Sequence, residues 1–142
     1  MTIRTEWVVL DTNVWIFGLR RQPEYPACVK LLNSLNQLRV RIPRQILREL
    51  QANLSDEEMH EIFRLLNRYS ERVDIQWDKA DPLLVEKYQR LGCRLGDAVV
   101  AAHLEALEVK AIVSENRHFL SEIQELPFRV LSSSDALLEV TS

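Results

Sequence analysis

Glycine and cysteine are scarce in this chain of 142 residues, which holds three glycines and two cysteines. Cys28 and Cys93 lie far apart and form no CxxC pair, so they indicate reduced cytosolic thiols, and nothing in their spacing supports a disulfide. Repeats, linkers and low-complexity segments are also missing. These absences favour one ordinary globular domain over residues 1–142, which is long enough to bury a real core.

Neither sign of charge is in large excess, and long apolar runs are absent. With 18 basic and 21 acidic residues the net charge is −3, which excludes binding to nucleic acid through bulk charge but not through a local basic groove. No apolar run approaches the roughly 20 residues of a membrane span, and the N-terminus lacks a signal-peptide pattern. We therefore expect a soluble, cytoplasmic protein that is not held in a membrane.

Short apolar runs alternate with helical patterns along the chain. Four apolar residues from Trp7 to Leu10 run without polar alternation, which is typical of a strand buried on both faces of a parallel sheet. Further strands are expected at residues 39–42, 73–75, 111–113 and 128–130. Helices are expected near residues 13–19, 26–38, 43–54, 55–69, 81–92, 95–106 and 134–138. The alternation predicts an α/β fold with a central parallel sheet flanked by helices on both faces.

One helix start has a specific signature. Ser55 is followed three residues later by Glu58, a capping box in which the Ser hydroxyl accepts from the Glu backbone N–H and the Glu carboxylate reaches back.

The first strand stops at a carboxylate. Asp11 follows Leu10 directly, and in open α/β sheets the functional crevice lies outside the carboxyl ends of the strands. Asp11 is therefore a candidate site residue. The alternative is that it merely caps the next helix, but Asn13 could take that role and leave Asp11 free.

Three more polar positions stand at the expected ends of elements. Glu49 lies on the helix opened by Pro43, Asp97 in the first turn of its helix, and Asn116 just after the strand at residues 111–113. Singly, each has a structural explanation: an arginine-paired surface residue, a carboxylate at a positive helix N-terminus, and a cap. Together they could converge on one crevice.

Converging carboxylates point to a particular chemistry. Several of them a few ångströms apart stay ionised only if cations neutralise them. Hard oxygen ligands select Mg²⁺ or Mn²⁺. Such a metal can hold a phosphodiester and lower the pKa of a bound water, so the reaction indicated is hydrolysis of a phosphate ester.

Four segments resemble the motifs of the PIN-domain ribonucleases, and within them the VapC-type toxins of bacterial toxin–antitoxin pairs. These segments are residues 9–13 (VLDTN), 46–50 (ILREL), 96–98 (GDA) and 113–119 (VSENRHF). They occur in the family's order, and the resemblance covers nearly the whole chain.

The resemblance implies a single PIN-like domain and endonucleolytic cleavage of RNA. It implies that Asp11, Glu49 and Asp97 ligate the metal and that Thr12 supports the substrate phosphate or a ligand water. Asn116 takes the fourth polar position, where many members carry an acid, so the number of metals is open. An antitoxin that blocks the crevice and a homodimer are also implied.

Basic and aromatic residues leave further alternatives. Six arginines crowd the first third of the chain and either line a groove for RNA phosphates or form a solvated face: Arg20, Arg21, Arg39, Arg41, Arg44 and Arg48. Arg44 and Arg48 flank Glu49 and are the candidates for substrate binding. Trp7, Trp15 and Trp77 are not spaced as a stacking platform, which favours core or interface positions. His118 is either a general base or a surface histidine.

Competing functions belong to other classes. A phosphatase of the haloacid-dehalogenase type also places an Asp after strand one, but it needs a second Asp at position 13, where this chain has Asn13. A catalytically weak PIN-like module that binds RNA or protein is the other alternative, and the three acids argue against it. Within the nuclease interpretation, a toxin and a housekeeping RNA-processing enzyme cannot be separated by sequence.

Overall fold

A five-stranded parallel sheet forms the centre of the computed structural model, which describes residues 3, 5–116, 123 and 126–141. The strands are β1 (Trp7–Leu10), β2 (Arg39–Pro43), β3 (Val73–Gln76), β4 (Ala111–Val113) and β5 (Arg129–Leu131). Their order is β3-β2-β1-β4-β5. All neighbouring pairs are parallel, with Val8 opposite Ala111 and Leu10 opposite Val113.

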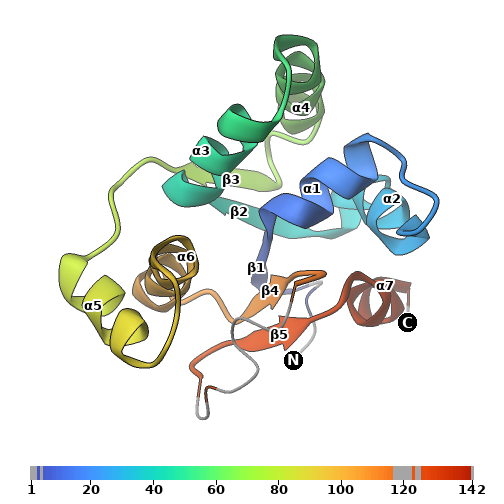
Figure 1. Ribbon diagram of the computed structural model, residues 1–142. Coiled ribbons are helices and arrows are strands. Elements are labelled where there is room, and N and C mark those ends of the chain that lie inside the picture. The colour runs from blue at the N-terminus through green and yellow to red at the C-terminus, as the bar shows by residue number, and fades with distance from the viewer. Residues whose placement is uncertain (1–2, 4, 117–122, 124–125, 142) are drawn as a thin grey trace.

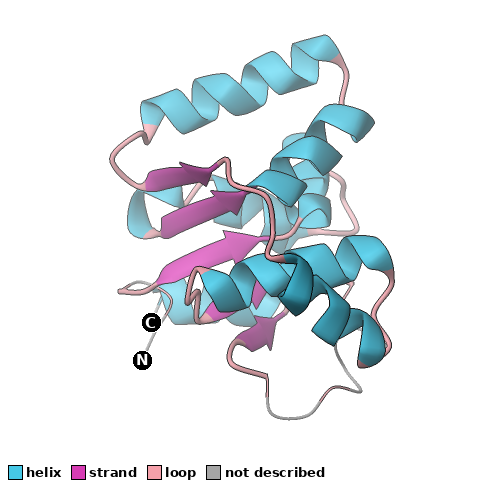
Figure 2. Ribbon diagram, turned by 90° about the vertical axis from the view of Figure 1, so that its left-hand side faces the viewer, coloured by secondary structure: helices cyan, strands magenta, loops and turns pink. Residues whose placement is uncertain are grey.

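Helices cover both faces of this sheet (Figures 1 and 2). They are α1 (Thr12–Leu19), α2 (Pro26–Leu32), the 3-10 turn η1 (Leu35–Gln37), α3 (Arg44–Asn53), α4 (Asp56–Arg68), α5 (Pro82–Arg90), α6 (Leu95–Ala106) and α7 (Ser133–Thr141). α5 and α6 pack together on one face, and α1, α2 and α7 lie on the other. The α/β class with a flanked parallel sheet, predicted from sequence, is confirmed. None of the helices in the described ranges is long and apolar enough to cross a membrane.

The strand order locates a crevice. β1 is the central strand, and Val8, Val9 and Leu10 are at most 1% exposed, as expected for a strand covered on both faces. The chain continues from β1 to β2, which pairs with β1 on one side, whereas β4 pairs with β1 on the other side. This reversal puts a gap at the carboxyl ends of β1 and β4, where α/β proteins bind ligands. α3 contacts both α1 and α6 and so links the helices of the two faces at this end.

Two predicted elements differ from the structure. The helix opened by Pro26 ends at Leu32 instead of continuing to Leu38, because the backbone N–H of Ser34 turns back to the carbonyl of Leu31. Leu35 and Leu38 are nonetheless fully buried, so the apolar pattern was correct and the conformation was not. The last helix begins at Ser133, and Ser132 rather than Ser134 accepts from the Asp135 N–H.

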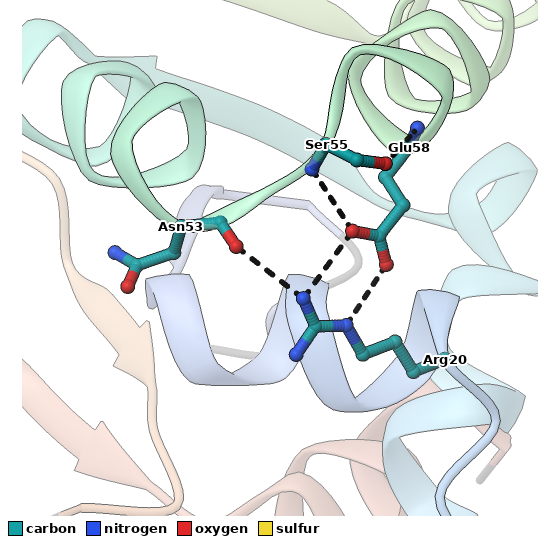
Figure 3. Close-up of polar contacts among 4 residues, drawn as sticks. All are labelled: Arg20, Asn53, Ser55 and Glu58. Atoms are coloured by element: carbon teal, nitrogen blue, oxygen red, sulfur yellow. Dashed lines mark hydrogen bonds and ion pairs between the residues drawn. The ribbon is translucent and has the colours of Figure 1, made fainter.

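The predicted capping box is present, and a guanidinium extends it (Figure 3). Ser55 and Glu58 exchange backbone-to-side-chain hydrogen bonds of 3.0 and 3.1 Å. Arg20, which ends α1, donates from Nε and Nη2 to the two carboxylate oxygens of Glu58, at 2.8 and 3.2 Å, and from Nη2 to the carbonyl of Asn53. One arginine therefore ties α1 to the junction of α3 and α4.

Candidate functional site

Asp11 lies at the carboxyl end of β1 and is half-buried. Its backbone N–H donates to the carbonyl of Val113 on β4 at 2.8 Å. One carboxylate oxygen accepts from the backbone N–H of Thr12 at 2.8 Å, and the other from the hydroxyl of Ser114 at 2.7 Å. Asp11 is thus itself the N-cap of α1.

The expectation that Asn13 would cap α1 is wrong. Asn13 lies inside the helix, and its amide donates to the Ser114 hydroxyl and accepts from the Glu115 backbone N–H. Asp11 caps α1 through one carboxylate oxygen, and its other oxygen accepts from the Ser114 hydroxyl.

Glu49 reaches the same place from α3. The hydroxyl of Thr12 donates to Oε1 of Glu49 at 2.5 Å, and the amide of Gln45 donates to Oε2 at 3.2 Å. Gln45 and Glu49 are one helical turn apart, so they share a face of α3. Thr12, which is expected to support substrate or a ligand water, donates to the second acid in this structure.

Asp97 comes from the first turn of α6. A β-carbon added to its neighbour Gly96 would lie 3.7 Å from Oε2 of Glu49, so the start of α6 packs directly against the second acid. The β1–α1 junction, the middle of α3 and the start of α6 therefore lie next to one another.

The acids influence one another electrostatically. The pKa of Asp11 is raised above 3.8, mainly by burial and further by the charges of Glu49 and Asp97, although the bonds from Ser114 and Thr12 oppose the rise. The pKa of Asp97 is raised by burial and by the charge of Glu49, with Arg94 opposing. The fold thus holds together carboxylates that repel one another, an arrangement typical of functional sites.

Ser114 is the residue that the sequence reasoning passed over. It is fully buried, and its hydroxyl donates to Asp11 while receiving the Asn13 amide and the Asn116 backbone N–H. A buried polar residue costs free energy unless it is hydrogen-bonded. A serine directly after a buried apolar strand was the available signal.

Glu115 and Asn116, the two residues after Ser114, have different surroundings in the structure. Asn116 is exposed, and its backbone N–H reaches Ser114, so it lies beside the acids without a described contact to them. The Glu115 carboxylate accepts from the backbone N–H of Ser133 and from the thiol of Cys28, which directs it toward α7 and α2 rather than into the crevice. His118 lies outside the described residues.

A hard divalent cation fits these donors. Within the described ranges, no three His, Cys, Asp or Glu side chains form a ready-made ligand group. Mg²⁺ does not require one, since it is usually bound through one or two carboxylates and keeps several waters. The donors around Asp11 are all oxygens, which suit Mg²⁺ or Mn²⁺ and not soft metals. A cation would also relieve the repulsion that raises the pKa of Asp11 and Asp97.

Two connected hollows extend from the acids. One, of about 510 Å³, is lined by Glu49, Gly96 and Arg48. The other, of about 340 Å³, is lined by Arg44, Arg48 and Lys79. They share three lining residues: Gln45, Arg48 and Val99. We call the pair the basic groove, since three cations line it next to the acids.

The other arginines of the first third are occupied elsewhere. Arg39 and Arg41 stack on the ring of Trp7, 4.4 and 4.5 Å from its centroid, at the amino end of the sheet. Arg41 also pairs with Asp74 at 2.9 Å. Of the six arginines, all within the described residues, only Arg44 and Arg48 line the basic groove.

Comparison with known proteins identifies a family profile and a shared fold. The PIN-domain profile matches residues 8–138. One similar chain comes from the crystal structure of VapBC2 from Rickettsia felis bound to a DNA fragment from the VapBC2 promoter. It is 16% identical to this chain, with a TM-score of 0.59, and the match covers 89% of this chain and 98% of that one. PAE2754 from Pyrobaculum aerophilum is 14% identical, with a TM-score of 0.53 over 99% and 98%. No curated protein matches the sequence.

Proposed function

Since the chain belongs to the PIN-domain family, we propose that it is a divalent-metal-dependent endoribonuclease that hydrolyses RNA phosphodiester bonds. The observation that supports the proposal is that Asp11, Glu49 and Asp97, which come from three elements, lie near enough to the carboxyl end of β1 for their charges to influence one another. Two of them have a pKa raised in part by the other acids. Such a cluster is costly for the fold and favours a cation-binding role over a structural one.

The residues of the site divide the work as follows. Asp11, Glu49 and Asp97 would hold Mg²⁺ or Mn²⁺, and Asn116 would offer a neutral oxygen for a second, weaker position. Ser114 orients Asp11, and Thr12 orients Glu49. When bound, the cation supplies Lewis-acid activation of water and of the scissile phosphate.

Substrate binding falls to the basic groove. Arg44 and Arg48 bind the backbone phosphates on the side of Glu49 that leads away from the sheet. Cationic side chains beside an acidic centre would hold the RNA strand by its phosphate charge. This explains how a protein of net charge −3 can bind a polyanion.

The test is cleavage of single-stranded RNA with and without Mn²⁺. Wild type should cleave only with metal, and Asp11→Asn should lose cleavage while keeping the fold, because the substitution removes charge and little volume. Asp56→Asn is the matched control, since Asp56 is exposed in the first turn of α4, away from the site. RNA cleavage by Asp11→Asn at the wild-type rate would contradict the metal site.

The same assay distinguishes a nuclease from the alternative, a catalytically weak module that binds RNA. Such a protein would retain RNA in a gel-shift experiment yet leave it intact at every Mn²⁺ concentration. Metal-dependent cleavage by wild type excludes this alternative.

We further propose that the protein is the toxin of a toxin–antitoxin pair and acts in the cytoplasm as a homodimer. Support comes from the fold shared with a chain of VapBC2. Expression of wild type should arrest bacterial growth, and expression of Asp11→Asn should not. A protein encoded by the neighbouring gene should restore growth and bind the purified chain, whereas a housekeeping nuclease would have no such neighbour. Light scattering measures the oligomeric state.

A further inference from the structure

Trp77 is placed unlike the other two tryptophans. Trp15 is fully buried, and its Nε1 donates to the carbonyl of Leu10 at 3.1 Å, while Trp7 is covered by two guanidinium groups. Trp77 is 62% exposed, so of the two expected positions, core and interface, the core is excluded for it. An indole left in water forfeits the free energy of its burial, which makes it a candidate contact surface.

The position of Trp77 joins it to the site. It directly follows β3, whose last residue Gln76 pairs with Pro43 at the end of β2. Because the strands are parallel, Trp77 follows β3 at the same edge of the sheet as Asp11. It begins the segment that joins β3 to α5, which can be followed in Figure 1. Its carbonyl accepts from Nη1 of Arg44 at 3.5 Å.

The basic groove connects the two places. Lys79, two residues after Trp77, lines the groove together with Arg44 and Arg48. Arg48 also lines the part of the groove that contains Glu49. Arg44, Lys79 and Arg48 therefore lie between the segment that begins at Trp77 and the part of the groove lined by Glu49.

We propose that Trp77 is a stacking platform for an unpaired base of the RNA whose phosphates lie along the basic groove. This rests on the proposed endoribonuclease function and specifies its substrate as RNA that is single-stranded on one side of the cut. Every base has a π-face, and its stacking on an aromatic ring tolerates any sequence. A base inside a duplex is already stacked on its neighbours and is closed to the indole.

Charge complementarity favours RNA over a protein partner at this position. Arg44 contacts the carbonyl of Trp77, and Lys79 follows two residues after it. Both cations line the part of the basic groove that adjoins the part lined by Glu49. A polyanion with flat apolar bases satisfies both features at once.

The test measures binding of the metal-free protein, which does not cleave, to a short single-stranded RNA and to an abasic ribose-phosphate strand of the same length. Wild type should bind the base-bearing strand more tightly, and that strand should quench the exposed tryptophan. Trp77→Ala and Trp77→Leu should weaken this binding by about 5- to 100-fold and leave binding of the abasic strand unchanged. Trp77→Phe should retain most of the affinity and lose the quenching.

The control variant is Leu138→Ala, which removes another strongly exposed apolar side chain, 68% exposed on α7. It should bind both strands as wild type does. Equal binding of the base-bearing strand by Trp77→Ala and wild type would overturn the proposal, and would assign the indole to a protein contact. An equal loss for both strands would also overturn it, since Trp77 would then support the shape of the groove.

Failure here is distinguishable from failure of the proposed function. If wild type cleaves RNA with Mn²⁺ but Trp77→Ala binds and cleaves equally well, the nuclease function is supported and the stacking role of Trp77 is contradicted. If wild type never cleaves but its tryptophan fluorescence is quenched only by strands with bases, the stacking role of Trp77 is supported and the nuclease function is contradicted.

Discussion

At the scale of single residues, one buried hydroxyl organises the candidate site. Ser114 donates to Asp11 and receives two N–H groups, from Asn13 and Asn116. The hydrogen bond lowers the pKa of Asp11 against the effect of burial. Ser114 therefore favours the ionised form of Asp11 and fixes the orientation of its carboxylate.

Replacing this hydroxyl should weaken both the fold and the metal site. Ser114→Ala leaves buried groups without partners, which should cost about 1–3 kcal/mol of unfolding free energy. It should raise the pKa of Asp11 further and increase the Mn²⁺ needed for half-maximal RNA cleavage. Urea unfolding and a metal titration measure the two effects. Ser70→Ala, at an exposed serine, is the control, and an unchanged metal requirement in Ser114→Ala would contradict the role.

The sequence predicted which residues carry charge at the site better than how they are held. Asp11 and Asp97 could be found because strand ends and helix starts are visible in the pattern. The role of Ser114 at the site could not be predicted in this way, because its hydrogen bond to Asp11 spans 103 residues and a local pattern contains no such pairing. The exposure of Trp77 was likewise hidden, since it depends on how the segment after β3 packs.

At the scale of elements, the contact of Arg20 with Glu58 joins α1 to the start of α4. The pKa of Glu58 lies at about 2, below its ordinary value of 4.5, because Arg20 and the Ser55 N–H both bond its carboxylate. The unfolded chain protonates Glu58 near 4.5. The stabilisation is therefore complete above that pH and is lost as the pH falls toward 2.

Glu58→Gln should accordingly be less stable than wild type near neutral pH, and the difference should shrink as the pH is lowered through this window. Urea unfolding midpoints at several pH values test it, with Glu57→Gln as the control on the same helical turn. A difference that stays constant with pH would rule out the ion pair as its source.

The packing of α1 on α2 depends on a glycine. A β-carbon on Gly18 would lie 2.8 Å from the Cys28 carbonyl and 2.7 Å from Cδ1 of Leu32, so the two helices would have to separate. Gly18→Ala should lose about 1–3 kcal/mol of unfolding free energy. Gly96→Ala, where the nearest atom is 3.7 Å away, should be neutral or slightly stabilising. Equal thermal stability of the two variants would contradict this account.

Element types were predictable where apolar periodicity is strong, and ends were not. The helix from Pro26 was predicted to reach Leu38 because the leucines keep helical spacing, yet it ends at Leu32. A 3-10 turn keeps Leu35 buried as well. Burial was therefore determined by the pattern, while the conformation was determined by backbone hydrogen bonds that the pattern does not contain.

At the scale of the whole molecule, a cation that binds only the folded chain must raise its stability. Mn²⁺ at ten times its dissociation constant should add about 1.4 kcal/mol and raise the melting temperature by about 3–6 °C. Asp97→Asn should blunt the rise by removing one ligand. Calorimetry with and without Mn²⁺ measures the rise in melting temperature. The control is Asp56→Asn, measured in the same way in Ca²⁺-free buffer. An unchanged wild-type melting curve in millimolar Mn²⁺ would count against the metal site.

The pairing of β1 with β4 also has a consequence for the newborn chain. Asp11 is made early, but the hydroxyl that aims it arrives 103 residues later, which takes about 5–20 seconds on a ribosome. Asp97 is itself made only 17 residues before Ser114, so for most of that interval the chain lacks both the third acid and β4, which pairs with β1. The cell is therefore exposed to the assembled centre only when most of the protein has been synthesised, and a prematurely terminated fragment that stops before Ser114 carries the acids without the means to align them.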